Sequence, residues 1–125
     1  TTLHEGKLLT ELNEISGTFE KYLHEFARNT AHILFKKNQG AAYFLADATL
    51  FLEGAGLLCM GWMWLKQAIT AQKALNQGSI DQNFHLGKIE TARYTVSYEL
   101  TKLNGILERF TSTQYPTLDM KTDWF

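Results

Sequence analysis

Nearly every position from Ala41 to Leu65 is apolar, and this stretch constrains the fold more than any other feature of the sequence. Its only charged residues are Asp47 and Glu53. A helix that is apolar all round must be buried on most sides, because apolar surface is unfavourable in water. We therefore expect the segment from Ala41 to about Gln77 to form the central helix of a core.

Two further segments show the three- and four-residue spacing of amphipathic helices. The first predicts a helix over about residues 4–38 that ends at Lys37-Asn38-Gln39-Gly40, and the last predicts a helix over about 82–111. The apolar stripe of the first segment comprises Leu8, Leu12, Ile15, Phe19, Tyr22, Phe26 and Ile33. The stripe of the last comprises Ile89, Val96, Leu100, Leu103, Leu107 and Phe110.

Short connections between these segments determine the topology. Connections of about four residues require neighbouring helices to run antiparallel. Residues 112–125 do not continue the three- and four-residue spacing of apolar residues, so we expect a mostly irregular tail. Its candidate docking residues are Tyr115, Leu118, Trp124 and Phe125. The sequence therefore predicts an all-α fold, an up-down antiparallel bundle of three long helices with a short C-terminal tail, and one domain over residues 1–125.

The uncharged run GAGLLCMGWMWL, residues 54–65, suits a core, an association surface or a membrane span. A span needs about 20 apolar residues, and widening the run to that length includes Glu53 or Lys66. We therefore expect no membrane span. Trp62 and Trp64 project about 160° apart on a helix, which predicts packing on two sides. Small residues allow another helix to approach closely. We therefore expect close helix contacts at the small residues of this run, Gly54, Ala55, Cys59 and Gly61.

The charge balance and the single cysteine exclude some classes of protein. Twelve Lys and Arg against thirteen Asp and Glu give a formal net charge of −1 at pH 7, so nucleic acid is not an expected partner. Cys59 excludes an internal disulfide and is typical of a reducing compartment, so we expect the cytoplasm. The N-terminus has no secretory-signal pattern and no initiator Met, which predicts a processed chain or one cut from something longer.

Motifs for chemistry are incomplete in this chain. Di-iron bundles need Glu-x-x-His from two helices, whereas Glu20 and His24 are spaced Glu-x-x-x-His and have no second copy. Arg28 stands where a zinc-protease motif would have its second His. Together with His32 these residues predict a solvated face. Cys59 has no basic residue within a helical turn, which predicts an inert buried thiol. We predict no catalytic, cofactor-binding or metal-binding residue.

Arg93 occupies an apolar slot of the last helix. It is predicted to pair with an acid on a neighbouring helix, Asp47 or Glu53, or to reach an interface, or to lay its aliphatic stem on the core with its head solvated.

Two motifs carry a resemblance to a known family. The segment Gly61-Trp62-x-Trp64-Leu65, then Ala68 and Ala71, then Phe84-x-x-Gly87-Lys88-x-x-Thr91-Ala92-Arg93-Tyr94, resembles the extra C-terminal helical domain of the longer acyl-CoA dehydrogenases. The match covers about residues 45–100, and residues 1–40 and the tail match only as helix of suitable length. Leu100-Thr101 stands where family members often have Leu-Pro, so we expect the last helix to continue further here.

The resemblance implies a parent flavoprotein that removes hydrogens from the α and β carbons of an acyl-CoA thioester. A carboxylate takes the α proton and FAD accepts the hydride, and both belong to a catalytic core upstream of this chain. This chain is then a non-catalytic domain for packing and subunit association, whose partners are the rest of the parent and a further copy. A free-standing helical-bundle protein-interaction module is the alternative reading, and a small-ligand or metal-binding bundle is a third.

Overall fold

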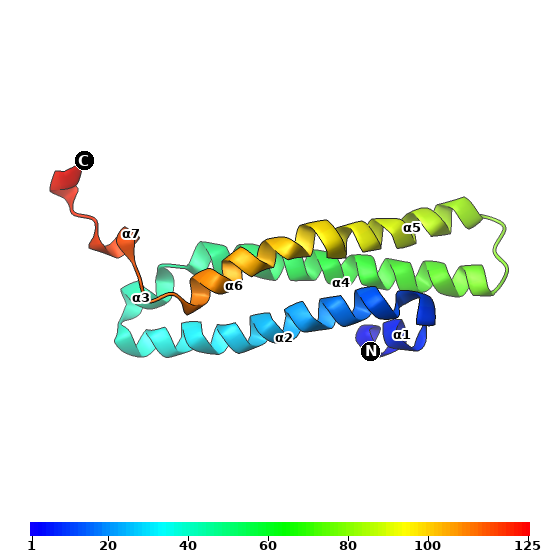
Figure 1. The fold of residues 1–125 in the computed structure, drawn as a ribbon, viewed down its shortest axis with the longest axis horizontal. Coiled ribbons are helices and arrows are strands. Elements are labelled where there is room, and N and C mark those ends of the chain that lie inside the picture. Colours follow the sequence, from blue (N-terminus) through cyan, green and yellow to red (C-terminus); the bar gives the residue numbers. More distant parts are fainter.

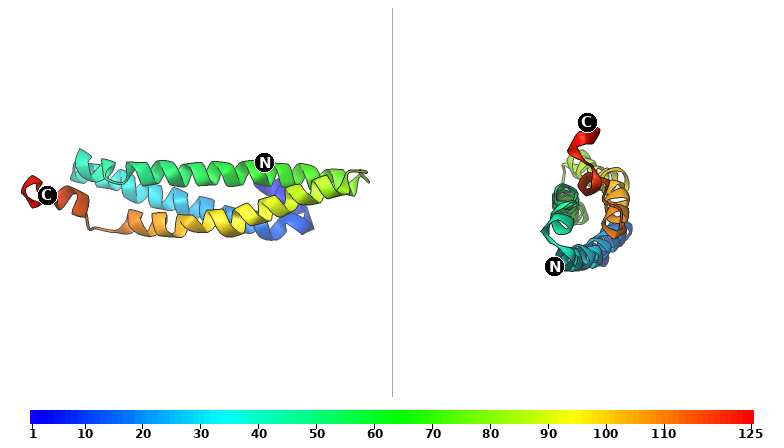
Figure 2. Two further views of the ribbon diagram at one scale, coloured as in Figure 1. Left: turned by 90° about the horizontal axis from the view of Figure 1, so that it is seen from above. Right: turned by 90° about the vertical axis from the view of Figure 1, so that its left-hand side faces the viewer.

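The computed structural model describes residues 1–125, apart from the side chains of Lys7 and Leu8. Three long helical stretches run up, down and up beside one another (Figure 1). They are α2 (Asn13–Lys36), α4 (Ala48–Asn76), and a third stretch that begins with α5 (Gln82–Tyr94) and ends with α6 (Leu103–Thr111). The end-on view shows them grouped around a common interior (Figure 2). The predicted all-α antiparallel bundle is confirmed.

The predicted first helix, residues 4–38, is wrong at its start. The chain forms α1 (Thr2–Leu8), turns at the extended residue Leu9, passes through the short 3₁₀ helix η1 (Thr10–Leu12) and then enters α2. α1 folds back against α2 and α4. A methyl group at Gly6 would lie 2.2 Å from Ser16 Oγ, so this return depends on glycine. Leu8, which the spacing assigns to the apolar stripe, lies outside the described side chains.

Two glycines make the reversals between the long stretches. Gly40 has φ 129° after the 3₁₀ turn η2 (Lys37–Gln39), and Gly78 has φ 81° after α4. Both values lie in the region that favours glycine, so both predicted helix ends are confirmed. The predicted central segment is divided near its start, because the short helix α3 (Ala41–Leu45) precedes a turn at Ala46–Asp47.

The third stretch keeps its predicted bounds and continues past Leu100, as expected. It contains a π-helical segment, η3 (Thr95–Glu99), followed by the 3₁₀ segment η4 (Leu100–Lys102). Ile89, Ala92 and Val96 are buried at three- and four-residue spacing, so Ala92 faces the core and Arg93 is exposed.

The core lies along the inner sides of all three stretches. Its most deeply buried large side chains include Leu12, Leu65, Leu100, Leu103 and Phe110. Two glycines of α4 admit neighbouring side chains: a methyl at Gly54 would lie 2.7 Å from Phe26 Cε2, and one at Gly61 would lie 3.1 Å from Leu100 Cδ1. The predicted close approach is confirmed at both positions.

The tail contains α7 (Pro116–Asp119) and the 3₁₀ turn η5 (Thr122–Trp124), and it projects away from the bundle (Figure 1). Tyr115 is buried, as predicted. Leu118, Trp124 and Phe125 are exposed, the last of them to 95%, so their predicted docking is wrong. Beyond Pro116 the tail points away from the core, and these side chains do not reach it.

Candidate functional site

α4 has two opposite apolar faces, and only one of them is inside the bundle. The inner face is buried and comprises Gly54, Leu58, Gly61, Leu65 and Ala68. The outer face of α4 comprises Leu52, Gly56, Cys59, Met60 and Met63, all of them exposed. Leu52 is 73% exposed and Met63 is 44% exposed. The prediction that this helix is buried on most sides is therefore wrong.

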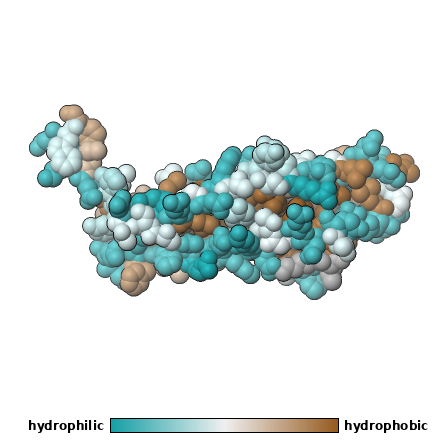
Figure 3. Space-filling view, in the orientation of Figure 1, coloured by the Kyte–Doolittle hydropathy of each residue, from teal (hydrophilic) through white to brown (hydrophobic). Residues whose placement is uncertain are grey.

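The number of helices explains the open face. α4 contacts α1 and α2 in one direction and α5, η3 and α6 in another. In a bundle of three, each long helix has neighbours on its inner half only, whereas residues 54–65 carry apolar side chains all round. Hydrophobic residues also reach the surface along the middle of the molecule and at the α4–α5 end (Figure 3). At that end the exposed side chains are Ile80, Phe84 and Leu86.

The two tryptophans of α4 lie on opposite flanks of the outer face. Trp62 Nε1 donates to Thr2 Oγ1 of α1 at 3.1 Å. Trp64 packs against the core on the other flank, where Lys88 Nζ of α5 lies 5.3 Å from its ring centroid. The predicted packing on two sides is confirmed, because each ring contacts a different neighbouring helix.

Cys59 is exposed on the outer face, which contradicts the prediction of a buried thiol. Leu58, the residue before it, takes the buried position. Cys59 also lines an apolar groove of about 580 Å³ between α4, α2 and the N-terminus. The other residues of this groove are Thr1, Thr2, Leu3, Phe19, Leu23, Leu58 and Trp62.

A buried ionic cluster fastens the opposite end of the bundle. Asp47 accepts a hydrogen bond from Arg109 Nε at 3.0 Å, and its other oxygen lies 3.7 Å from Lys36 Nζ. Lys36 Nζ also donates to the Ser112 carbonyl at 3.2 Å. Both cations lie about 5 Å from the Tyr115 ring centroid, at 5.0 and 5.1 Å. The cluster joins α2, the start of α4, α6 and the base of the tail.

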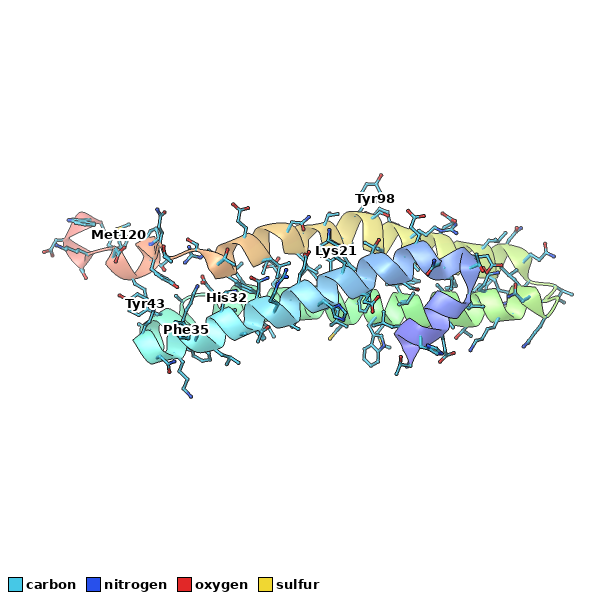
Figure 4. All side chains as sticks on the ribbon, turned by 60° about the horizontal axis from the view of Figure 1, so that its bottom comes forward. Lys21, His32, Phe35, Tyr43, Tyr98 and Met120 are labelled. Carbon is cyan, nitrogen blue, oxygen red and sulfur yellow. The ribbon has the colours of Figure 1, made fainter. Side chains whose placement is uncertain are left out.

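A pocket of about 560 Å³ opens beside this cluster. His32 and Phe35 of α2 and Tyr43 of α3 line it, and all three lie at the end of the bundle from which the tail leaves (Figure 4). Met120 lies farther out, on the tail itself (Figure 4). The cluster was missed by the sequence reasoning, although Lys36 continues the apolar stripe three residues after Ile33 and was a usable signal.

Arg93 pairs with neither Asp47 nor Glu53, so its predicted pairing with the central helix is wrong, and its predicted place at an interface stays a prediction. Its guanidinium pairs with Glu90 on the same helix and donates to the Glu11 carbonyl at 3.3 Å. Its head is solvated, as in the aliphatic-stem role, but the side chain as a whole is exposed.

Of the predicted solvated face, His24, Arg28 and His32 are exposed, as predicted, and Glu20 is half-buried. In the part of the chain that the structure describes, no group of three or more His, Cys, Asp or Glu side chains is placed to hold a metal ion.

The comparisons with known proteins identify the family. The family model described as acetyl-CoA dehydrogenase C-terminal like matches residues 2–121. The chain belongs to this family. A search of curated proteins and a search of solved structures each gave no match. The family match extends beyond residues 45–100, where the two motifs lie, and includes the N-terminal helices and most of the tail.

The stretch formed by α3 and α4 of this acyl-CoA dehydrogenase C-terminal domain also meets a membrane criterion. Among the described residues, Ala41–Asn76 is long and apolar enough to cross a bilayer by length and composition alone, with 22% of its most apolar window buried. Core helices of soluble proteins meet the same test. The low burial of this window reflects the exposed outer face of α4. The expectation of no membrane span stays a prediction.

Proposed function

We propose that this domain is the non-catalytic C-terminal part of an FAD-dependent acyl-CoA dehydrogenase and serves packing and subunit association. The parent reaction is the α,β-dehydrogenation of acyl-CoA thioesters in fatty acid metabolism, in the cytoplasm. FAD and acyl-CoA bind elsewhere in the parent. Membership of the family supports the proposed parent enzyme. The exposed apolar outer face of α4 supports the proposed role in subunit association.

The outer face carries the association part of this proposal. Burying apolar surface is favourable by roughly 25 cal/mol per Å², and isolated domains seldom leave a contiguous apolar strip on a long helix. Two of its members, Met60 and Met63, are flexible side chains of the kind enriched where proteins meet. A partner that covers α4 would therefore gain affinity without any change in the bundle.

A free-standing interaction module is the second candidate, and the same face favours it. The two candidates differ in what is attached to the domain. In the alternative, the partner of the outer face is another protein, with no flavin or acyl-CoA chemistry in the same chain.

The first experiment is the mass of the native product in its source cells, detected with an antibody raised against this chain. A product much heavier than 14.3 kDa is expected. We then expect flavin absorbance in the purified product and reduction of an electron-accepting dye that depends on added acyl-CoA. A native product of 14.3 kDa, or a heavier product without flavin, would overturn the proposed parent.

The association role has its own test in the heavier product. Sedimentation of the whole parent is compared with sedimentation of the parent lacking this domain. We expect the truncated form to keep its flavin but to lose subunits from the assembly. An unchanged assembly would contradict the association role while leaving the parent reaction in place.

A further inference from the structure

We propose that the pocket beside the buried ionic cluster binds a small aromatic carboxylate, with its negative charge at Lys36 and its ring among the aromatic side chains of the wall. The pocket lies where α2, α3 and α6 meet the base of the tail (Figure 4). None of the residues of the outer face of α4 lines it. This inference is therefore independent of the proposed role in subunit association.

The ionic cluster carries one more positive charge than negative charge. Its single carboxylate, Asp47, is shared by Lys36 and Arg109. Arg109 Nε donates a hydrogen bond to Asp47 Oδ1 at 3.0 Å, whereas Lys36 Nζ lies 3.7 Å from Asp47 Oδ2, which accepts no hydrogen bond. The unmatched charge therefore belongs mainly to Lys36. An incompletely paired buried cation is unfavourable, and a further anion beside it would offset that cost.

The ammonium group of Lys36 lies at the wall of the pocket. Nζ donates to the Ser112 carbonyl at 3.2 Å and lies 5.0 Å from the Tyr115 ring centroid, and Lys36, Ser112 and Tyr115 all line the pocket. An ammonium group has three N–H donors, and the Ser112 carbonyl accepts from only one of them. The Lys36 side chain is 10% exposed, so a carboxylate that reaches Nζ would form a charge-assisted hydrogen bond largely shielded from water.

The other polar side chains of the pocket are compatible with an anion. Among the described residues, no Asp or Glu lines it. Gln39 and Thr113 line it, and neither side chain makes a hydrogen bond within the described part of the chain. An amide and a hydroxyl can each donate to a carboxylate oxygen. The pocket therefore favours a negatively charged ligand over a positively charged one.

Aromatic rings form much of the remaining wall, and they belong to Phe35, Tyr43, Phe110 and Tyr115. Tyr43 and Tyr115 are in edge-to-face contact with their centroids 5.0 Å apart. Such rings pack favourably against a flat aromatic body, and a volume of about 560 Å³ is typical of small-molecule sites. The single unmatched charge suits a carboxylate better than a phosphate monoester, which carries close to two negative charges.

The first test compares three probes by following the amide resonances of the chain during NMR titration. Benzoate has the ring and the charge, benzamide has the ring without the charge, and acetate has the charge without the ring. We expect benzoate to bind at least about tenfold more tightly than either, with the largest shifts at Gln39 and Thr113. Equal affinity for benzoate and benzamide, or for benzoate and acetate, would overturn the proposal. Tighter binding of inorganic phosphate than of benzoate would also overturn it.

Lys36→Met removes the ammonium group and leaves Asp47 matched one-to-one with Arg109. We expect this variant to lose at least about tenfold in benzoate affinity and to keep its affinity for benzamide. Lys37→Met is the matched control, because Lys37 is the next residue, is exposed and does not line the pocket. Its benzoate affinity is expected to be unchanged. Equal losses in the two variants would show a general effect of charge and would overturn the site.

Thr113→Glu tests the pocket without altering the buried cluster. Thr113 is exposed, so the variant is expected to fold, and unchanged circular dichroism melting confirms this. A negative charge in the pocket is expected to lower benzoate affinity at least about fivefold and to leave benzamide affinity unchanged. Ser97→Glu adds the same charge at an exposed position that does not line the pocket, and no change is expected. Unchanged benzoate affinity in Thr113→Glu would overturn the proposal, even where Lys36→Met fails to fold.

Discussion

Asp47 Oδ1 accepts a hydrogen bond from Arg109 Nε at 3.0 Å, across 62 positions of sequence. Asp47 is the N-cap residue of α4, and Arg109 lies in the last turn of α6. Their contact therefore joins the beginning of one long stretch to the end of the next. Lys36 of α2 contacts the same carboxylate, with its Nζ 3.7 Å from Asp47 Oδ2. Three stretches are thus held at one end by a single buried side chain.

Asp47→Asn is expected to lower the free energy of unfolding by about 3 kcal/mol, because it leaves the buried Lys36 without its counter-charge. Urea unfolding measures the loss. Glu90→Gln is the matched control, since its pair with Arg93 is exposed, and a change below about 0.5 kcal/mol is expected there. Equal losses in the two variants would show that the cluster contributes no more than a surface pair.

Gly54→Ala is expected to destabilise the bundle by about 1–3 kcal/mol, although alanine favours helices. The added methyl would lie 2.7 Å from Phe26 Cε2, and a ring in the core has little room to move. Thermal unfolding is the measurement. Gly105→Ala in α6 is the control, because a methyl there meets nothing within 4 Å, and a gain of up to about 1 kcal/mol is expected. A gain in both variants would contradict the close approach.

The Glu5–Lys73 pair between α1 and α4 should make stability depend on pH. Lys73 donates a hydrogen bond to the Glu5 carboxylate, and this bond, with the positive charge of Lys73, holds the pKa of Glu5 below its ordinary value of 4.5. A lowered folded-state pKa gives stability that is present above the unfolded pKa and is lost as pH falls through the folded value.

We therefore expect Glu5→Gln to melt at a lower temperature than the native chain at neutral pH. The two melting temperatures should converge as the pH falls below the pKa of Glu5 in the folded state. Melting curves collected from neutral pH into the acid range measure this. Glu14→Gln, which removes an exposed carboxylate from α2, is the matched control. A difference that persists at low pH would show that Glu5 acts through packing.

Arg93→Leu is expected to change the free energy of unfolding by less than about 0.5 kcal/mol, because Arg93 is exposed and its ion pair is on the surface. Ala92→Leu is the contrasting variant. Ala92 is fully buried, so extra volume there should cost about 1–3 kcal/mol. The reverse order of the two effects would contradict the burial of Ala92 and the exposure of Arg93 in α5.

The bundle was predictable because its signals are local. Gly40 and Gly78 mark the reversals whatever the rest of the chain does, and the spacing through Phe19 and Leu103 assigns both side chains to the core, where they lie. The break at Leu9 was not predictable, because the contacts that hold α1 back involve residues far along the chain, such as Lys73.

The candidate surface was only half predictable. Residues 54–65 marked α4 as the unusual helix, but the residue types do not say which side lacks a neighbour. Leu58 and Met63 are both apolar, and only the placement of α2 and α5 buries the first and exposes the second. Asp47 and Arg109 likewise lie too far apart in sequence for spacing to pair them.

The tight reversal at Gly78 has a consequence for how the chain folds. It places α4 and α5, which are consecutive in sequence, in contact along their lengths. Chains whose contacts join near neighbours lose little loop entropy before those contacts form, and helical bundles of this kind fold within about microseconds to milliseconds. The α4–α5 hairpin is therefore the expected nucleus. The inner side of residues 54–65 is covered instead by Phe26 of α2 and by Leu100 and Leu103 of the third stretch, so it stays open to aggregation with other unfolded chains until those segments dock.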